Sequence, residues 1–172
     1  DNTVKEVVPN RENIPSKPHK RIIKDVENVP YPEKLIVPFI DTVHNRVVLE
    51  LFRGCTRGCR FCQAGMIYRP IREKSVERLK EIVDKLVKST GYDEISLSSL
   101  STSDYSKLSE LTDYLVDEYA SNNIGISLPS LRLDNFSMEI AEKIQQVRKS
   151  GLTFAPEAGT QRLRDVINKG VS

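Results

Sequence analysis

The sequence has no long apolar run and little histidine or cysteine. No stretch of about eighteen apolar residues occurs, so a membrane-spanning helix is not predicted. Residues 1–6 lack the apolar core of a secretory signal peptide. These absences favour a cytoplasmic protein without a membrane partner. Only two histidines, His19 and His44, and three cysteines are available as nitrogen and sulfur ligands for a metal.

The composition is that of a folded domain with balanced charge. The 172 residues suffice for about one domain with a buried core. The net charge is only +2, from 26 basic and 24 acidic residues, whereas nucleic-acid-binding domains are usually far more basic. A local basic cluster surrounds the cysteines and comprises Arg53, Arg57, Arg60, Arg69, Arg72 and Lys74. We interpret these cations as support for a metal centre and for anionic groups of a cofactor or substrate, with a nucleic-acid ligand as the alternative.

All three cysteines lie within one short stretch. Cys55, Cys59 and Cys62 form a C-x3-C-x2-C pattern after a strand-like run. Thiolates packed this closely in a reduced protein favour a shared metal centre over a disulfide. Three thiolates leave one iron of a [4Fe-4S] cluster without a protein ligand and open to substrate. Structural zinc completed by a histidine is an alternative, although such sites usually use C-x2-C pairs. A ferredoxin-like carrier would need a fourth cysteine.

The cysteine pattern and its neighbours resemble a known family. Cys55, Cys59 and Cys62, with Phe61 before the third cysteine, resemble the cluster motif of the radical S-adenosylmethionine (SAM) superfamily. The resemblance implies that the open iron of a [4Fe-4S] cluster chelates SAM, that reductive cleavage gives a 5′-deoxyadenosyl radical, and that Phe61 lies beside the adenine. Residues 54–65 and 68–70 are similar to an uncharacterised branch with an upstream cobalamin-binding-like domain. Cobalamin would be a cofactor only through such a domain, which residues 1–172 do not contain.

The rest of the chain predicts an arm followed by alternating strands and helices. Residues 1–32, interrupted by five prolines, predict an extended linker or arm, and residues 33–172 predict the N-terminal part of a radical SAM core domain. The apolar ranges 34–40 and 46–52 predict a β-hairpin that leads into the cysteine loop. Helices are predicted over 75–91, 104–123, 137–151 and 160–170, and strands over 94–100, 124–128 and 152–155.

This alternation predicts an α/β fold, a partial parallel (β/α) barrel of the radical SAM type with about four βα units. By the resemblance, we expect the chain to be truncated before the last βα units.

Polar residues follow the predicted strands, where ligands of parallel sheets gather. Ser98 and Ser99 end the second strand, at the place where the resembled family has a glycine-rich segment whose backbone meets the amino group of SAM. This sequence has serines there instead, and we expect the same location to contact SAM. Arg132, after the third strand, is placed to bind a carboxylate, with a surface ion pair as the alternative. After the fourth strand, the resemblance implies that Glu157 approaches the amino group or ribose of SAM and that Arg164 faces its carboxylate.

These patterns favour a radical SAM enzyme core that acts on an unknown substrate and receives electrons from a donor such as flavodoxin or ferredoxin. The rival is a zinc-stabilised, non-catalytic domain that binds nucleic acid or protein. A tRNA-modifying methylthiotransferase is a second enzymatic alternative, which would need a further cluster-bearing domain and an RNA-binding domain. Because substrate contacts in such enzymes come largely from later strands and accessory domains, we expect residues 1–172 alone to be inactive or weakly active.

Overall fold

A three-stranded parallel sheet forms the centre of the chain. The computed structural model describes residues 2–172. The sheet contains β1 (Val47–Glu50), β4 (Glu94–Ser98) and β5 (Gly125–Ser127), in the order β1-β4-β5. Val47 lies opposite Ile95, and Ile95 lies opposite Ile126. A second, antiparallel sheet pairs β2 (Phe52–Arg53) with β3 (Arg72–Glu73). The predicted α/β fold with a parallel sheet is confirmed.

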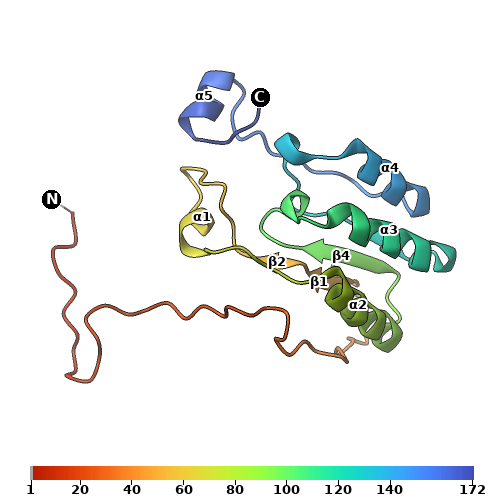
Figure 1. Ribbon diagram of the computed structural model, residues 1–172, viewed down its shortest axis with the longest axis horizontal. Coiled ribbons are helices and arrows are strands. Elements are labelled where there is room, and N and C mark those ends of the chain that lie inside the picture. The colour runs from red at the N-terminus through yellow and green to blue at the C-terminus, as the bar shows by residue number, and fades with distance from the viewer. Residues whose placement is uncertain (1) are drawn as a thin grey trace.

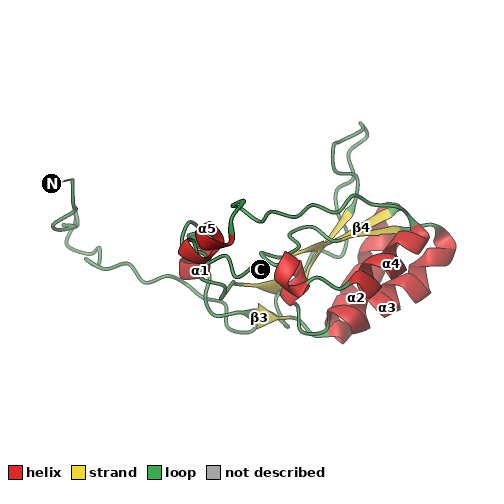
Figure 2. Cartoon of the chain, turned by 90° about the horizontal axis from the view of Figure 1, so that it is seen from above, coloured by secondary structure: helices red, strands yellow, loops and turns green. Residues whose placement is uncertain are grey.

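Helices alternate with these strands along the chain. They are α1 (Ala64–Ile67), α2 (Val76–Thr90), α3 (Leu108–Tyr119), α4 (Met138–Val147) and α5 (Gln161–Val166). Short 3₁₀ turns cover Thr102–Asp104, Ala120–Asn122 and Leu133–Asn135. Helices α2, α3 and α4 lie side by side along one side of the sheet, whereas α1 and α5 lie near each other at the other end of the molecule (Figures 1 and 2). The cysteine loop therefore lies at the end that faces α5.

The sheet buries one of its faces under the helices. In β1, Val47 and Leu49 are fully buried, whereas Val48 between them is 45% exposed. Successive side chains of a strand point to opposite faces, so the apolar set lies under the helices. Glu50 and Ser98 pair in register on the opposite face, at the carboxyl ends of β1 and β4. These strand ends therefore present polar side chains next to the cysteine loop.

Helix α2 matches its predicted bounds because its sequence contains clear end signals. The Ser75 side chain accepts a hydrogen bond from the Arg78 amide, and Gly91 ends the helix with a φ of +69°. Apolar residues recur at helical spacing, and Leu79, Val83 and Leu86 are fully buried against the sheet. An N-cap, an apolar stripe and a left-handed glycine together define this element.

The predicted hairpin over 34–40 and 46–52 does not form. Residues 34–40 contain no strand, and Ile36 and Phe39 are fully exposed. The edge of β1 is instead covered by Tyr31, whose hydroxyl donates to the Val48 carbonyl over 2.8 Å. The antiparallel pairing in the structure is instead that of β2 with β3, which follows the cysteine loop, whereas β1 pairs in parallel with β4.

The predicted strand over 152–155 is also absent, so the sheet has three parallel strands rather than four. A cavity of about 230 Å³ lies beside β5 and is lined by Glu94, by the β5 residues and by Arg148, Lys149 and Ser150 of the chain after α4. Phe154 packs edge to face on Phe136, with 4.8 Å between the ring centroids. Residues 152–155 are thus held by side-chain packing outside the sheet.

The helix predicted over 104–123, with Asp104 as its expected N-cap, is shorter in the structure. Asp104 closes a 3₁₀ turn, and α3 begins at Leu108 without a side-chain cap. The Asp104 carboxylate accepts from Arg57 and from Ser101 instead. The Asp104 carboxylate therefore binds these two side chains and not the first backbone amides of α3.

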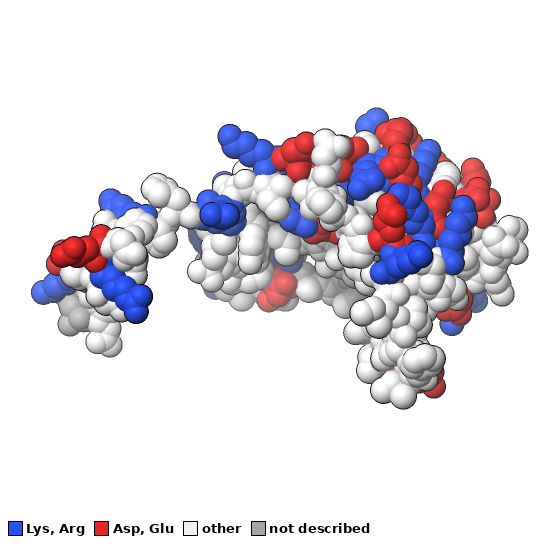
Figure 3. All heavy atoms as spheres, turned by 90° about the horizontal axis from the view of Figure 1, so that it is seen from below, with Lys and Arg blue, Asp and Glu red and all other residues white. Residues whose placement is uncertain are grey.

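Residues 2–46 form an arm without helix or strand that extends away from the sheet (Figure 1). Its later part is attached, because Val26 is buried and the Glu27 carboxylate accepts from the Ser75 amide over 2.8 Å. Among residues 2–172, no helix has the length and apolar character needed to cross a membrane. On the face seen in Figure 3, acidic and basic side chains are interspersed over the helical part.

Candidate functional site

The cysteine loop runs from the end of β2 to α1 and is held at its start by a backbone hydrogen bond. The Cys55 amide donates to the Tyr68 carbonyl over 2.9 Å, and the Cys62 amide donates to the Cys59 carbonyl over 3.0 Å. All three cysteines are free and half-buried. The loop therefore carries three free thiols just beyond β2.

Glycine is required where the loop begins. Gly54 has a φ of +110°, and a Cβ at this position would lie 2.6 Å from the Pro70 carbonyl oxygen and 2.9 Å from that of Tyr68. Any side chain would collide with backbone that has no room to move. Gly54 therefore lets the residues before Cys55 pass directly against the segment that follows the loop.

The donor set of the loop fits an iron–sulfur cluster. Its three thiols are soft ligands, and no histidine or carboxylate side chain occurs between Cys55 and Cys62. Within residues 2–172, however, no three His, Cys, Asp or Glu side chains are drawn together closely enough to hold a metal ion. The loop thus fits an iron–sulfur cluster by the chemical type and the exposure of its three thiols, and not by an arrangement of the thiols around a metal position.

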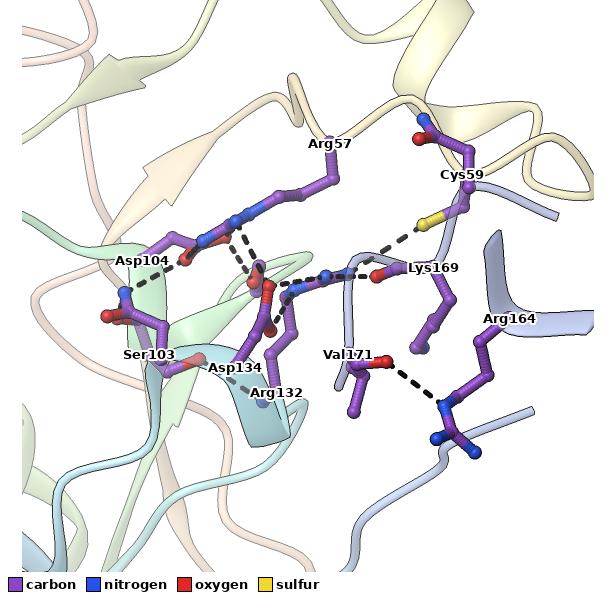
Figure 4. A network of polar contacts seen from close by, with 12 residues as sticks. Arg57, Cys59, Ser103, Asp104, Arg132, Asp134, Arg164, Lys169 and Val171 are labelled. Carbon is purple, nitrogen blue, oxygen red and sulfur yellow. Dashed lines mark hydrogen bonds and ion pairs between the residues drawn. The ribbon is translucent and has the colours of Figure 1, made fainter. Parts of the chain in front are cut away.

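An alternating network of arginines and aspartates joins the loop to the ends of β4 and β5 (Figure 4). The Arg57 guanidinium binds Asp104 and lies 3.2 Å from the Asp134 carboxylate. Arg132 binds Asp134 through two hydrogen bonds of 2.9 and 2.8 Å. Its remaining terminal nitrogen lies 3.7 Å from the Cys59 sulfur. The loop is therefore tied to both strand ends by charge.

The two aspartates of this network stay ionised. Burial alone would raise the pKa of Asp104, but hydrogen bonds from Arg57, Ser101 and Asn135 outweigh burial and lower it below its ordinary value of 3.8. The pKa of Asp134 is lowered in the same way, because Arg132 and Arg57 outweigh its burial. The network thus consists of two anions and two cations at neutral pH.

The chain after α5 packs on the cysteine loop from the other side. The Arg60 amide donates to the Ile167 carbonyl, and the Asn168 side-chain amide donates to the Gly58 carbonyl, both over 2.9 Å. The Lys169 ammonium lies 3.3 Å from the Glu157 carboxylate and 5.9 Å from the centre of the Phe61 ring. These contacts bring Phe61 and Glu157, far apart in sequence, to one place.

Comparison with known proteins identifies the family. The profile described as "Radical SAM superfamily" matches residues 49–172, well over half of the chain. The chain belongs to the radical SAM superfamily. The open parallel sheet with its covering helices is accordingly part of a radical SAM β/α barrel, and the matched range begins in β1, just before the cysteine loop.

Two relatives from the archaeon Methanocaldococcus jannaschii are similar to this radical SAM chain. "Uncharacterized protein MJ0966" is 36% identical over 124 residues, which cover 72% of the chain and 26% of the relative. "Putative methylthiotransferase MJ0865" is 29% identical over 135 residues, which cover 73% of the chain and 29% of the relative. The chain thus spans little more than a quarter of the length of the curated relatives it matches.

The residues that were predicted to contact SAM lie in three different places in this radical SAM chain. Phe61, Glu157 and Arg132 gather around Lys169 and the cysteine loop. Ser98 and Ser99 line a cavity of about 420 Å³ that begins at Gly54. Arg164 instead binds carbonyls of its own segment, those of Val171 over 3.0 Å and Ala158 over 3.1 Å.

Several residues of the site escaped sequence reasoning. Asp104 had the pattern of a helix cap, and Asp134 and Lys169 had no distinguishing neighbours in sequence. Their partners lie in distant elements, so only the fold brings them to the loop. For Arg57, position within the cysteine loop was the one available signal.

Proposed function

We propose that the chain is the cluster-bearing core of a radical SAM enzyme. In this proposal Cys55, Cys59 and Cys62 hold a [4Fe-4S] cluster with one iron open to SAM. When bound, the cluster and SAM supply one-electron cleavage of the sulfonium, which yields methionine and a 5′-deoxyadenosyl radical for hydrogen abstraction from an unknown substrate. The observation that carries the proposal is the loop of three free thiols beside the strand ends within the matched range.

The side chains around the loop support SAM binding by orienting its groups and limiting water. Phe61 offers an aromatic face for the adenine, and Glu157 offers a carboxylate for the amino group or ribose. Ser98 and Ser99 are proposed to meet the amino-acid end of SAM in the neighbouring cavity. Arg132 and Arg164 are proposed to steady the loop and the α5 segment when SAM is present, because their guanidinium groups bind protein acceptors. The electron donor would be a flavodoxin or ferredoxin.

Electron paramagnetic resonance tests the proposal on anaerobically reconstituted full-length protein reduced with dithionite. A four-iron signal that changes when SAM is added is the expected result. Cys59→Ala should abolish the signal and the production of 5′-deoxyadenosine, whereas Thr56→Ala, an exposed neighbour in the same loop, should retain both. A silent wild-type sample that contains one zinc ion per folded chain would contradict the proposal and favour the zinc-stabilised binding domain.

Methylthio-group transfer is a second candidate, favoured by the name of one relative, "Putative methylthiotransferase MJ0865". It would require a second cluster in the longer protein. Iron analysis of the reconstituted full-length protein separates the two candidates, since two [4Fe-4S] clusters give about eight irons per chain and one gives about four. About four irons in protein that cleaves SAM would eliminate the transfer reaction.

A further inference from the structure

A cavity next to the cysteine loop has a charge pattern that the proposed contacts do not explain. It measures about 420 Å³, within the size range of small-molecule sites. It lies where β1 and β4 end and is lined by Glu50, Phe52, Arg53, Gly54, Tyr68, Arg72, Ser98, Ser99 and Leu100. Two arginines but only one carboxylate thus face this largely apolar space.

The one carboxylate of the lining is already neutralised. Glu50 accepts from Arg53 over 2.8 Å and from the Lys74 ammonium over 2.8 Å. Lys74 is only 3% exposed, so the cation of this pair is shielded from water, whereas the Glu50 side chain is 29% exposed. With Arg53 and Lys74 both bound to Glu50, the charges of this group already sum to one positive charge before Arg72 is counted.

Arg72 is held in place without a counter-ion. Its Nε donates to the Pro70 carbonyl over 3.1 Å, and one terminal nitrogen donates to the Ile23 carbonyl over 2.8 Å. Within residues 2–172, no carboxylate oxygen lies within 4.0 Å of this guanidinium. The nearby carboxylates of Glu27 and Glu73 bind Ser75 and Ser106. A second cation, Lys20, lies 4.6 Å from the ring centre of Tyr68 in the same lining.

The arginines of the cysteine-loop network differ from Arg72 in this respect. Arg57 and Arg132 bind aspartates, so their charge is balanced within the protein. Arg72 is half-buried as a residue, and its guanidinium, bound to neutral carbonyls, has no internal counter-ion and one terminal nitrogen left for a ligand. An anion entering the cavity would therefore gain a charge-assisted hydrogen bond without displacing an internal carboxylate.

We propose that this cavity is an anion-binding subsite, in which Arg72, supported by Arg53, binds a carboxylate or phosphate group of a ligand lodged beside the cysteine loop. The anion comes either from the carboxylate of SAM, in which case the inference rests on the proposed function, or from the substrate. The apolar walls formed by Phe52, Tyr68 and Leu100 would pack against the body of that ligand.

Titration calorimetry on the anaerobically reconstituted full-length protein tests the subsite. SAM and 5′-methylthioadenosine are compared, because the latter keeps the nucleoside and lacks the carboxylate. Inorganic pyrophosphate added to SAM-saturated protein is the probe for a substrate anion. The variants are Arg72→Gln and, as control, Arg148→Gln, which removes an exposed arginine paired with Asp93 at the amino ends of the strands.

If the anion is the SAM carboxylate, Arg72→Gln weakens SAM roughly tenfold to a hundredfold, methylthioadenosine binds as in the wild type, and the control changes neither. If the anion belongs to the substrate, SAM binding is unchanged and pyrophosphate binding is lost in Arg72→Gln alone. Both results support the subsite. Unchanged binding of both SAM and pyrophosphate in Arg72→Gln would overturn it.

A folding defect would weaken methylthioadenosine as much as SAM. If Arg72→Gln shows such a defect, Arg72→Lys is measured as well, because it keeps the positive charge. Recovery of anion binding in Arg72→Lys supports the subsite, and no recovery overturns it. If wild-type protein binds no SAM, the proposed function fails. The cavity is then still tested by comparing pyrophosphate binding to the SAM-free wild type with its binding to Arg72→Gln and Arg148→Gln.

Discussion

Single residues around the cysteine loop act through partners that are remote in sequence. Asp104 shows this most clearly, because its carboxylate receives hydrogen bonds from the Arg57 guanidinium, the Ser101 hydroxyl and the Asn135 amide. Its side chain is only 12% exposed. Since a buried charge without partners is costly, these donors are needed to keep Asp104 ionised. The charge of one residue thereby holds together the loop and two strand ends.

Removal of the Asp104 charge should destabilise the fold in a pH-dependent way. At pH 7, Asp104→Asn should lower the free energy of unfolding by roughly 1–3 kcal/mol, because Arg57 loses its charged acceptor. The pKa of Asp104 is lowered in the folded state, so its contribution is complete above its ordinary value of 3.8 and is lost as the pH falls further. Urea unfolding at pH 7 and at about pH 3 measures this difference, which should shrink in acid.

The exposed Asp117 provides the control, and Asp117→Asn should leave stability nearly unchanged at both pH values. An Asp104→Asn deficit of equal size at both pH values would contradict the assignment of this effect to the carboxylate.

At the scale of elements, the sequence predicted the bounds of an element correctly where the element's own residues contain signals for both of its ends and for its buried face. Helix α2 has Ser75, Gly91 and an apolar stripe, and its bounds were predicted within one residue. Residues 34–40 and 152–155 have strand-like composition but no pairing partner. Strand formation depends on a neighbour that composition does not reveal. For the same reason, the three cysteines were found from their spacing, while the positions of Asp134 and Lys169 required the fold.

Helix α2 should depend on its buried face far more than on its exposed one. Leu86→Ala should lower the free energy of unfolding by roughly 2–5 kcal/mol, because this fully buried side chain would leave a cavity against the sheet. Lys88→Ala, on the exposed side of the same helix, should change it by less than about 0.5 kcal/mol. Denaturant unfolding of both variants measures this contrast, and equal effects would show that the helix is not anchored by its apolar stripe.

On the scale of the whole molecule, the cysteine loop is held between two regions. The segment 68–72 lies against its start, and the chain after α5 lies against its middle. Figure 2 shows α1 and α5 next to each other, away from the helices that cover the sheet. The loop therefore depends on contacts that close only when the last described residues are in place.

Loss of the α5 contact should loosen the loop without disturbing the sheet. Asn168→Ala removes the hydrogen bond to the Gly58 carbonyl, so the neighbouring bond from the Arg60 amide to Ile167 should open more often. Hydrogen exchange of the Arg60 amide should accelerate several-fold, whereas that of Val83 inside α2 should not change. Equal rates at Arg60 in variant and wild type would mean that α5 does not restrain the loop.

The order of the parallel strands has a consequence for biosynthesis. The cysteine loop is translated between β1 and β4, yet β1 has no partner until β4 has left the ribosome. Distant pairings of this kind form late, after the intervening chain has been made. The nascent chain therefore exposes three unprotected thiols for as long as the ribosome needs to complete α2 and β4. For the cluster proposed above, delivery of iron and sulfide to the loop would come after that interval, and the thiols would have to stay reduced until then.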